Sequence, residues 1–510
     1  MHIYGLLLRA TLVLLSTPSL ALAGPGGYLQ FVNLSPHDWQ LTYQHSYHME
    51  WKPTDLIPAG GIHEQYVEYK RHVGDNGDRG AEATYNLIGT DLSFTVQARQ
   101  NNGKKLLVEY SDGLAELTMT RDKVIDLGFD QDGSVLFVLS GNGTEPYISS
   151  KAPKNWMQAT LPQIGSKELR EISMPRSHDA GMTDITKSVL GIAHNTACQT
   201  LYIYDQLAHG ARWFDLRPAL RKGTWSANHF TKLPNGHHVG ALGNFFVDMV
   251  QDINGFNYHT PGELIILDIS HEIRKERHWI DDLQPDQWQD LYKVLEEIHD
   301  LWILNDSSLP DDLTTLPIST FIQPGSKSTV IVQIPDHAPL PDSGNPAFVH
   351  ESRLPYTGDW TDTDNPAVLD TEQTARLKQL RTSPKSPMFR LAWTIQPRVI
   401  DMADFANWRH SIIGEAMWAE RRLFQTIWDK LSPNTYPNLI EVDNIHNGQI
   451  AAISMVINQR YANADKEKAV KREQPTTRSA SRLHIDTDST TRYSSEKGSN
   501  VSSNNEMELY

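Results

Sequence analysis

Hydrophobic and polar residues alternate with a period of two between residues 28 and 140. The clearest series are Trp39, Leu41, Tyr43 and Leu92, Phe94, Val96, Ala98. Such alternation is typical of strands with one buried face. Three dipeptides that favour tight turns separate the apolar runs, namely Asn102-Gly103, Asp112-Gly113 and Asp132-Gly133. We therefore predict an antiparallel β-sandwich over residues 24–140. Nothing in it resembles a catalytic set, so an accessory or binding role is expected.

The pattern changes after residue 155, where short apolar runs alternate with amphipathic segments. Buried strands are predicted at residues 211–216, 263–269, 329–334, 390–395 and 438–442, and helices at residues such as 288–301 and 415–431. Repeated strand and helix units in a segment of this length predict an α/β barrel of the TIM type, irregular in detail, over residues 155–462. Its chemistry is expected at the carboxyl ends of the strands.

The two ends of the chain have compositions unlike the rest. Residues 1–23 contain an early Arg9, an apolar run and then Ala21-Leu22-Ala23, which together predict a secretory signal peptide and a mature chain beginning near Gly24. Residues 463–510 are polar and lack periodicity, so we predict a disordered tail. A secreted, extracellular protein follows from this interpretation.

Two further features concern the exported chain. Residues 141–154 are rich in Gly, Ser, Pro and Lys and are predicted to be a linker between the two domains. The sequons at Asn142 and Asn305 are compatible with a glycoprotein, and the sequon at Asn33 is weaker because Pro36 follows it.

Composition excludes several classes of function. The 510 residues include 46 Lys and Arg against 62 Asp and Glu, a formal charge of −16. This charge argues against nucleic acid as a partner and against adsorption to anionic membranes by charge. Cys198 is the single cysteine, which excludes an intrachain disulfide framework, a multi-cysteine zinc cluster and an iron–sulfur site.

Common catalytic motifs are also missing from the sequence. It contains no G-x-S-x-G elbow, Walker loop, G-x-G-x-x-G or H-E-x-x-H. His271-Glu272 is the nearest approach to a zinc helix, but the next histidine stands at 278 instead of 275. We interpret this pair as a strand-end and surface feature.

A set of polar residues remains, each placed after a predicted strand: His178-Asp179, Arg217 and His229. Taken singly, each has a more common explanation. His178-Asp179 could be a structural pair, Arg217 a salt bridge with Asp215, and His229 an ordinary loop histidine. Taken together, they fit phosphodiester cleavage, which needs a base, an acid and a cation on the phosphate. Histidine suits the first two roles at neutral pH.

Five segments appear in an order that is known from one family. They are Pro175-Arg-Ser-His178-Asp179-Ala, Gly210-Ala-Arg-Trp-Phe-Asp-Leu-Arg217, Asn228-His229-Phe230, Glu263-Leu-Ile-Ile-Leu267 and Leu439-Ile-Glu-Val-Asp443. They resemble the phosphatidylinositol-specific phospholipase C X-domain family, in particular its metal-independent bacterial and fungal PLC-like phosphodiesterase branch. The resemblance covers residues from about 155 to 460, and the second segment is the specific one.

The resemblance implies a role for each residue. His178 would be the general base for the inositol 2-hydroxyl, oriented by Asp443, a residue that only the resemblance identifies. Arg217 would neutralise the phosphate. His229, paired with Asp179, would protonate the departing diacylglycerol oxygen and leave a cyclic inositol phosphate. Arg217 stands where the calcium-dependent branch has an acidic ligand, so neither metal nor cofactor is expected.

Two departures from the family's motifs bear on the substrate class. Arg176-Ser177 replaces Gly-Thr before the base, and Ser270-His271 stands where a charged residue is frequent. Trp393 lies on a predicted strand, where it either stacks on a sugar-like ring or packs in the barrel core.

The expected partners are a phospholipid substrate with an inositol head group and, transiently, a membrane surface. Two alternatives stay open. One is a lipid- or carbohydrate-binding protein with a catalytically silent barrel. The other is a metal-dependent phosphodiesterase of the glycerophosphodiester or sphingomyelinase-D type, which needs a carboxylate cage that Arg217 argues against.

Overall fold

The computed structural model describes residues 24–70, 79–100, 103–141, 146–189, 191–232, 237–275, 280–303, 309–396 and 411–462. The predicted signal peptide, the tail and the sequons at Asn142 and Asn305 lie outside these residues and stay predictions. Asn33 is fully buried, and its side-chain amide donates to the carbonyls of His37 and Ile57. The folded chain therefore offers no glycan acceptor at Asn33.

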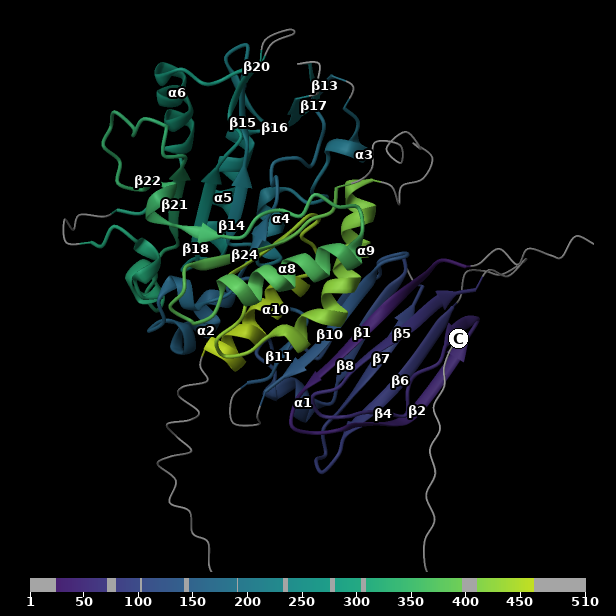
Figure 1. Ribbon diagram of the computed structural model, residues 1–510. Helices are drawn as coiled ribbons and strands as arrows, with labels where there is room; N and C mark the ends of the chain where they lie inside the picture. Colours follow the sequence, from purple (N-terminus) through teal and green to yellow (C-terminus); the bar gives the residue numbers. More distant parts are fainter. Residues whose placement is uncertain are drawn as a thin grey trace, which may run out of the picture. The chain divides into compact units, whose positions relative to one another are not determined.

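The first part of the described chain is built mainly of strands (Figure 1). They are β1 (Gly26–Leu34), β2 (Trp39–Tyr47), β3 (Met49–Trp51), β4 (Leu56–Ile57), β5 (Ile62–Tyr69), β6 (Gly80–Leu87), β7 (Ser93–Arg99), β8 (Lys105–Tyr110), β9 (Val124–Gly128), β10 (Ser134–Ser140) and β11 (Ile148–Ser149), with helix α1 (Asp112–Leu117). One sheet has the order β11-β10-β1-β5-β3 and the other β4-β2-β6-β7-β8-β9.

An aromatic cluster fills the space between these two sheets. The ring of Trp39 on β2 lies 4.9 Å from that of Phe94 on β7 and 5.7 Å from that of Phe137 on β10. Because Phe137 belongs to the other sheet, the two sheets share one core, as in a β-sandwich. Phe94, Val96 and Ala98 are buried with the predicted alternation.

The sandwich differs from the prediction in its strand directions and turns. It is not purely antiparallel, because β1 and β10 pair in parallel. Asp112-Gly113 opens helix α1 instead of a hairpin, and Asp132-Gly133 connects strands of different sheets. A bulge between Leu41 and Tyr43 shifts the register of β2, so Tyr43 points to solvent with 51% of its surface exposed.

The described part of the predicted linker, residues 141 and 146–154, is partly packed into the fold. Residues 142–145 lie outside the described chain, but β11 pairs with β10 directly after them. Tyr147, Ile148 and Ser150 are buried, and the Ser150 hydroxyl accepts from the backbone of Val138 at 2.7 Å. Apolar residues of β1 and β10 also join the barrel's core, and the described residues belong to one compact unit.

The second part alternates strands and helices (Figure 1). Its strands are β12 (Met174–Ser177), β13 (Lys187–Val189), β14 (Trp213–Leu216), β15 (Pro218–Arg221), β16 (Thr224–Lys232), β17 (His238–Phe245), β18 (Leu264–Ile269), β19 (Ile273–Lys275), β20 (Ile280–Asp281), β21 (Thr329–Ile334), β22 (Phe348–His350), β23 (Tyr356–Thr357), β24 (Met388–Trp393) and β25 (Leu439–Val442). Its helices are α2 (Trp156–Ile164), α3 (Ala193–Thr196), α4 (Ile203–Ala208), α5 (Phe246–His259), α6 (Pro285–Leu295), α7 (Ile318–Phe321), α8 (Pro366–Leu380), α9 (Ile412–Thr426) and α10 (Gln449–Ile457).

Eight of these strands form one parallel sheet with the order β22-β21-β18-β14-β12-β25-β24-β23. The order follows the chain cyclically, because the last strand, β25, pairs with the first, β12. The described residues show no pairing between β22 and β23, so the barrel is irregular and open there. Strands β18 and β21 are buried along their whole length, which explains their continuous apolar sequences.

A second sheet, β13-β17-β16-β15-β19-β20, is built from segments that follow β12, β14 and β18. It begins where the barrel strands end, since β15 starts two residues after β14. This sheet brings further side chains to the carboxyl end of the barrel. Among the described residues, no helix has both the length and the apolar character to span a membrane.

Candidate active site at the carboxyl ends of the barrel strands

Three predicted site residues each stand directly after a barrel strand. His178 follows β12, Arg217 follows β14 and Asp443 follows β25. Because β12 pairs with both β14 and β25, the barrel order places these three side chains together. His229 comes from β16 of the second sheet, near a bulge between Ser226 and Asn228.

His178 is held between a carboxylate and a guanidinium. Its Nδ1 lies 2.7 Å from Asp443 Oδ1, and Arg217 Nη2 lies 2.8 Å from its Nε2. A guanidinium only donates, so Nε2 is the accepting nitrogen and Nδ1 carries the hydrogen. Burial disfavours the charged ring, but the Asp443 carboxylate outweighs burial and raises the pKa of His178. The ring therefore presents a basic Nε2.

His229 has a similar carboxylate partner. Its Nδ1 lies 2.8 Å from Asp179 Oδ2, and Asp179 is fully buried. Asp179 has a φ of 41°, a left-handed conformation that is uncommon for residues with side chains. The backbone N–H of Asp179 donates to Asp215 Oδ2 at 3.0 Å, which helps to hold this conformation. Among the described residues, the His229 Nε2 has no hydrogen-bond partner, and His229 lines the cavity described below.

Arg217 connects the two imidazole pairs. Its Nη1 donates to Asp179 Oδ2 at 3.3 Å, and its Nε donates to Asp215 Oδ2 at 3.0 Å. Burial raises the pKa of Asp215, but the charges of Arg217 and Arg176 outweigh burial and hold it well below its usual range. The guanidinium is thus fixed in place, with 14% of the side chain exposed.

The site opens into a cavity of about 420 Å³ that all four of His178, Arg217, His229 and Asp443 line. Its remaining lining is formed by Arg176, Asn195, Asp215, Phe230, Thr231, Ser270, His271, Tyr356, Trp360, Arg390, Thr394, Ile395, Gln396, Ile412 and Glu441. A substrate group of moderate size therefore has access to both imidazoles at once.

Sequence reasoning missed a second charged cluster in this cavity. Arg176 Nε donates to Glu441, and its Nη1 donates to Asp268 Oδ2 at 2.7 Å. The Tyr356 ring lies between two guanidiniums, 5.4 Å from that of Arg176 and 5.3 Å from that of Arg390. The only signal in the sequence was the bulky Arg176 in place of a glycine. Its charge is compensated by buried carboxylates in the barrel.

Ser270 and His271, noted as a departure from the family's motif, also line the cavity. The Ser270 hydroxyl donates to Asp215 Oδ1 at 2.5 Å and lies 2.9 Å from His271 Nδ1. Glu272 instead pairs with His337 at 2.6 Å, away from the catalytic residues. The adjacent His271 and Glu272 therefore have different partners.

Trp393 does not reach the cavity. Its side chain is 1% exposed, and its indole N–H donates to the carbonyl of Ala419 at 2.8 Å. Of the two positions left open for Trp393, the structure shows the one in the core, and a role in substrate binding is corrected accordingly, because a ring packed under helix α9 has no free face for stacking. The aromatic residues at the cavity are Phe230, Tyr356 and Trp360.

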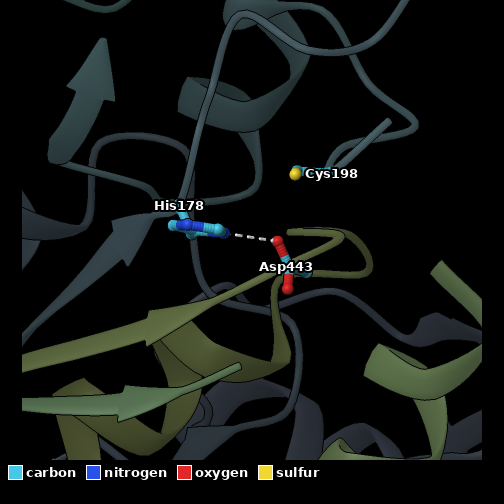
Figure 2. A group of neighbouring side chains, drawn as sticks. All are labelled: His178, Cys198 and Asp443. Carbon is cyan, nitrogen blue, oxygen red and sulfur yellow. Dashed lines mark hydrogen bonds and ion pairs between the residues drawn. The ribbon is translucent and has the colours of Figure 1, made fainter. Parts of the chain in front are cut away.

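Cys198 lies against both imidazole pairs. Its Sγ is 3.4 Å from His229 Nδ1, and Figure 2 shows it beside the hydrogen-bonded His178 and Asp443. Donor atoms of Cys198, His178 and Asp443 lie within 4.8 Å of one another, as do those of Cys198, Asp179 and His229. Burial and the neighbouring carboxylates raise the pKa of the thiol well above its usual value. A protonated thiol is a weak metal ligand.

The chemistry that this arrangement permits is acid–base catalysis on an anion. Two imidazoles stand on either side of one guanidinium, and each has a buried carboxylate behind its Nδ1. Arg217 already contacts two carboxylates, so binding of an anion is favoured when one imidazole is protonated. One charged and one neutral imidazole are also what an acid and a base require.

Comparison of the sequence with protein-family models finds no match, and comparison with curated proteins finds none either. Among solved structures, the chain is similar to a variant of the phosphatidylinositol-specific phospholipase C from Staphylococcus aureus, at 15% identity and a TM-score of 0.42, covering 59% of this chain and 98% of that chain. It is similar to the phosphatidylinositol-specific phospholipase C from Listeria monocytogenes at 14% identity and a TM-score of 0.39, with the same coverages. The lipid-binding protein Nakanori matches 23% of this chain and 72% of that chain, at 12% identity and a TM-score of 0.18. At such low identities, the chemistry has to be argued from the residues of this chain.

Proposed function

We propose that the protein is a phosphodiesterase that uses His178 and His229 as general base and general acid and Arg217 as the phosphate-binding cation. The observation that carries this proposal is the pair of carboxylate-backed imidazoles on either side of one buried guanidinium, all open to the same cavity. The three groups supply the base, the acid and the cation that phosphodiester cleavage requires.

The reaction begins with a hydroxyl group next to the phosphate. As its oxygen forms a bond to phosphorus, its proton passes to Nε2 of His178, and Asp443 stabilises the resulting imidazolium. The hydrogen bond from Arg217 to this nitrogen is exchanged for bonds to the phosphate oxygens. The bond from phosphorus to the leaving oxygen breaks, and His229 donates its Nε2 proton to that oxygen. The products are a cyclic phosphodiester and an alcohol.

A phosphatidylinositol-type lipid is the proposed substrate, and it rests on the motif resemblance described above. In that substrate the attacking group is a ring hydroxyl of the head group, and the leaving group is the glycerol oxygen of the lipid. The cavity volume of about 420 Å³ accommodates a single sugar-like ring with its phosphate. Secretion and transient contact with a membrane surface belong to the same proposal.

A reaction without a metal ion is proposed because the carboxylates beside Arg217 are already paired with its guanidinium. Asp179 and Asp215 both form ion pairs with Arg217, at 3.3 and 2.8 Å. A divalent ion at this position would have to displace a fixed cation from its partners. This argues against the glycerophosphodiester and sphingomyelinase-D type of mechanism.

The test is an assay of purified protein on vesicles of phosphatidylinositol, lysolipid and choline lipids, with and without a chelator. We expect cleavage of phosphatidylinositol alone, unchanged by chelator, with a cyclic phosphate identified by phosphorus NMR. His337→Ala is the matched control, because His337 is also an imidazole paired with a carboxylate but is 67% exposed. Binding of vesicles without product would support the catalytically silent alternative, and activity lost in chelator would support the metal-dependent one.

A further inference from the structure

A second cluster of titratable residues lies outside the candidate active site, where the sandwich and the barrel meet. Asp130 stands between β9 and β10, Glu420 lies within α9, and His446 follows β25. One donor atom from each residue lies within 4.8 Å of the other two. Asp130 and Glu420 are 8% and 3% exposed. Nothing in the proposed reaction uses these three side chains.

The hydrogen bonds of His446 determine which of its nitrogens is the acceptor. Its Nδ1 lies 2.6 Å from the backbone carbonyl of Asn444, and a carbonyl only accepts, so Nδ1 carries a hydrogen. Its Nε2 lies 2.9 Å from Asp130 Oδ2. In a neutral ring, a nitrogen lone pair would face a carboxylate oxygen, which is repulsive. A cation must therefore lie between them, either a proton on Nε2 or a metal ion.

Glu420 distinguishes between these two cations. Within the described chain its carboxylate has no hydrogen bond and no ion pair, although the side chain is almost completely buried. A proton on His446 satisfies Asp130 at 2.9 Å, but Glu420 is then accommodated only as a neutral acid, because burial raises the pKa of its carboxyl group to about 8. Buried carboxyl groups normally have partners, because an unmade hydrogen bond or ion pair is costly in the interior. A single divalent cation would satisfy all three side chains.

We propose that Asp130, Glu420 and His446 bind a divalent transition-metal ion of the zinc class. Zinc accepts the combination of one imidazole nitrogen and two carboxylate oxygens, with water as a fourth ligand, whereas calcium prefers oxygen ligands alone. An imidazole whose other nitrogen donates to a backbone carbonyl is the usual form of a histidine ligand. Small side-chain adjustments bring donors within 4.8 Å to zinc-binding separations.

The consequence of this site is structural. Asp130 belongs to the sandwich, while Glu420 and His446 belong to the barrel, so the ion would join the two parts of the chain. His446 also stands three residues after Asp443, in the same turn after β25.

The experiment is isothermal titration of the full-length protein with zinc chloride after removal of metal and chelator. We expect one high-affinity site per chain, and at least ~100-fold weaker binding in Glu420→Gln, which keeps the side-chain shape. Glu272→Gln is the matched control, because Glu272 also faces a histidine, the exposed His337, and should leave affinity unchanged. Equal affinity in wild type and Glu420→Gln would overturn the proposal.

A second variant separates this site from the candidate active site. Cys198→Ser removes the ligand shared by the two metal-ligand groups there, and zinc binding should persist in this variant. With cobalt in place of zinc, the spectrum should lack the charge-transfer band of a thiolate ligand. Loss of the site in Cys198→Ser, or the presence of that band, would overturn the assignment.

Crystals of the wild-type protein soaked in zinc chloride give a test that does not depend on a variant's folding. An anomalous-difference peak is expected between Asp130, Glu420 and His446, and a peak only elsewhere would contradict the proposal. None of these measurements uses lipid cleavage. Their failure is therefore distinct from failure of the proposed phosphodiesterase activity.

Discussion

The core of the sandwich and the carboxyl end of the barrel use buried space in opposite ways. Between the sheets, aromatic rings such as Trp39 and Phe137 pack on one another, and the interior is almost entirely apolar. At the barrel's end, guanidiniums and carboxylates are buried together, as with Arg176 against Glu441. Burying charge is costly unless every group has a partner. The difference fits a sandwich core that serves stability and, under the proposed function, a barrel end that serves chemistry.

The largest effect is expected from removing either imidazole. His178→Ala and His229→Ala should each lower the rate of phosphatidylinositol cleavage by ~10²–10⁴-fold, because each removes a positioned proton-transfer group. Both side chains are partly exposed in the cavity, so thermal unfolding should change little. Vesicle assays together with circular dichroism melts measure the two effects. Full activity in the double variant would exclude the acid–base mechanism.

Truncation of a core side chain in the sandwich should lower stability and leave the catalytic rate unchanged. Trp39→Ala removes a fully buried ring, and we expect a loss of roughly 3–5 kcal/mol in the free energy of unfolding. The rate per folded molecule should stay unchanged, since Trp39 packs on Phe94 and is not among the residues that line the cavity. Denaturant titration and active-site-normalised rates test this. A large fall in rate without loss of stability would contradict the division between the two regions.

Arg217→Lys tests whether geometry matters at the phosphate as well as charge. A lysine ammonium cannot contact Asp179, Asp215 and the phosphate with a planar fork, so the rate should fall by about 10²-fold. Chelator should leave the wild-type rate unchanged at a temperature well below unfolding. Arg217→Asp is expected to gain some dependence on added calcium. A wild-type level of activity in Arg217→Lys would exclude a bidentate contact between Arg217 and the phosphate.

Asp443→Asn should change the pH profile more than the maximal rate. The carboxylate raises the pKa of His178, so removing its charge lowers that pKa and keeps the ring neutral at lower pH. The acid limb of kcat/KM, where the base becomes protonated, should therefore move to lower pH. The maximal rate should fall less than in His178→Ala, because Asp443 orients the base without receiving the proton. An unshifted acid limb would mean that another group controls it.

The smallest effect is expected at the bulge in β2. Tyr43→Ser changes an exposed side chain whose hydroxyl donates to Glu82 at 3.2 Å, so stability should change by less than about 0.5 kcal/mol. The sequence pattern instead places Tyr43 on the buried face, where its loss would cost several times more. Thermal melts compare the two cases, with Trp39→Ala as the buried reference on the same strand.

Local sequence was sufficient to predict five of the eight barrel strands, namely β14, β18, β21, β24 and β25, whereas the short strands β12, β22 and β23 were not among those predicted. A strand buried on both faces needs a continuous apolar run, so segments such as Leu264–Ile269 and Thr329–Ile334 could be recognised directly. His178 and Arg217 follow neighbouring strands, so the chain order alone placed them at the same end of the sheet. The polar position after a strand was therefore a correct signal for His178 and Arg217, whereas His229, also expected after a strand, lies within β16.

Tertiary structure decided the contacts that depend on strand register and on the pairing of the first and last barrel strands. Asp443 meets His178 across 265 residues because the last strand pairs with the first, a contact that no local pattern contains. One extra residue in β2 reversed the direction of Tyr43, because side chains of a strand alternate between faces. For Trp393, the sequence left both a cavity position and a core position open, and only the packing placed its ring in the core. Likewise, Asp130, Glu420 and His446 come together only because the sandwich and the barrel share an interior.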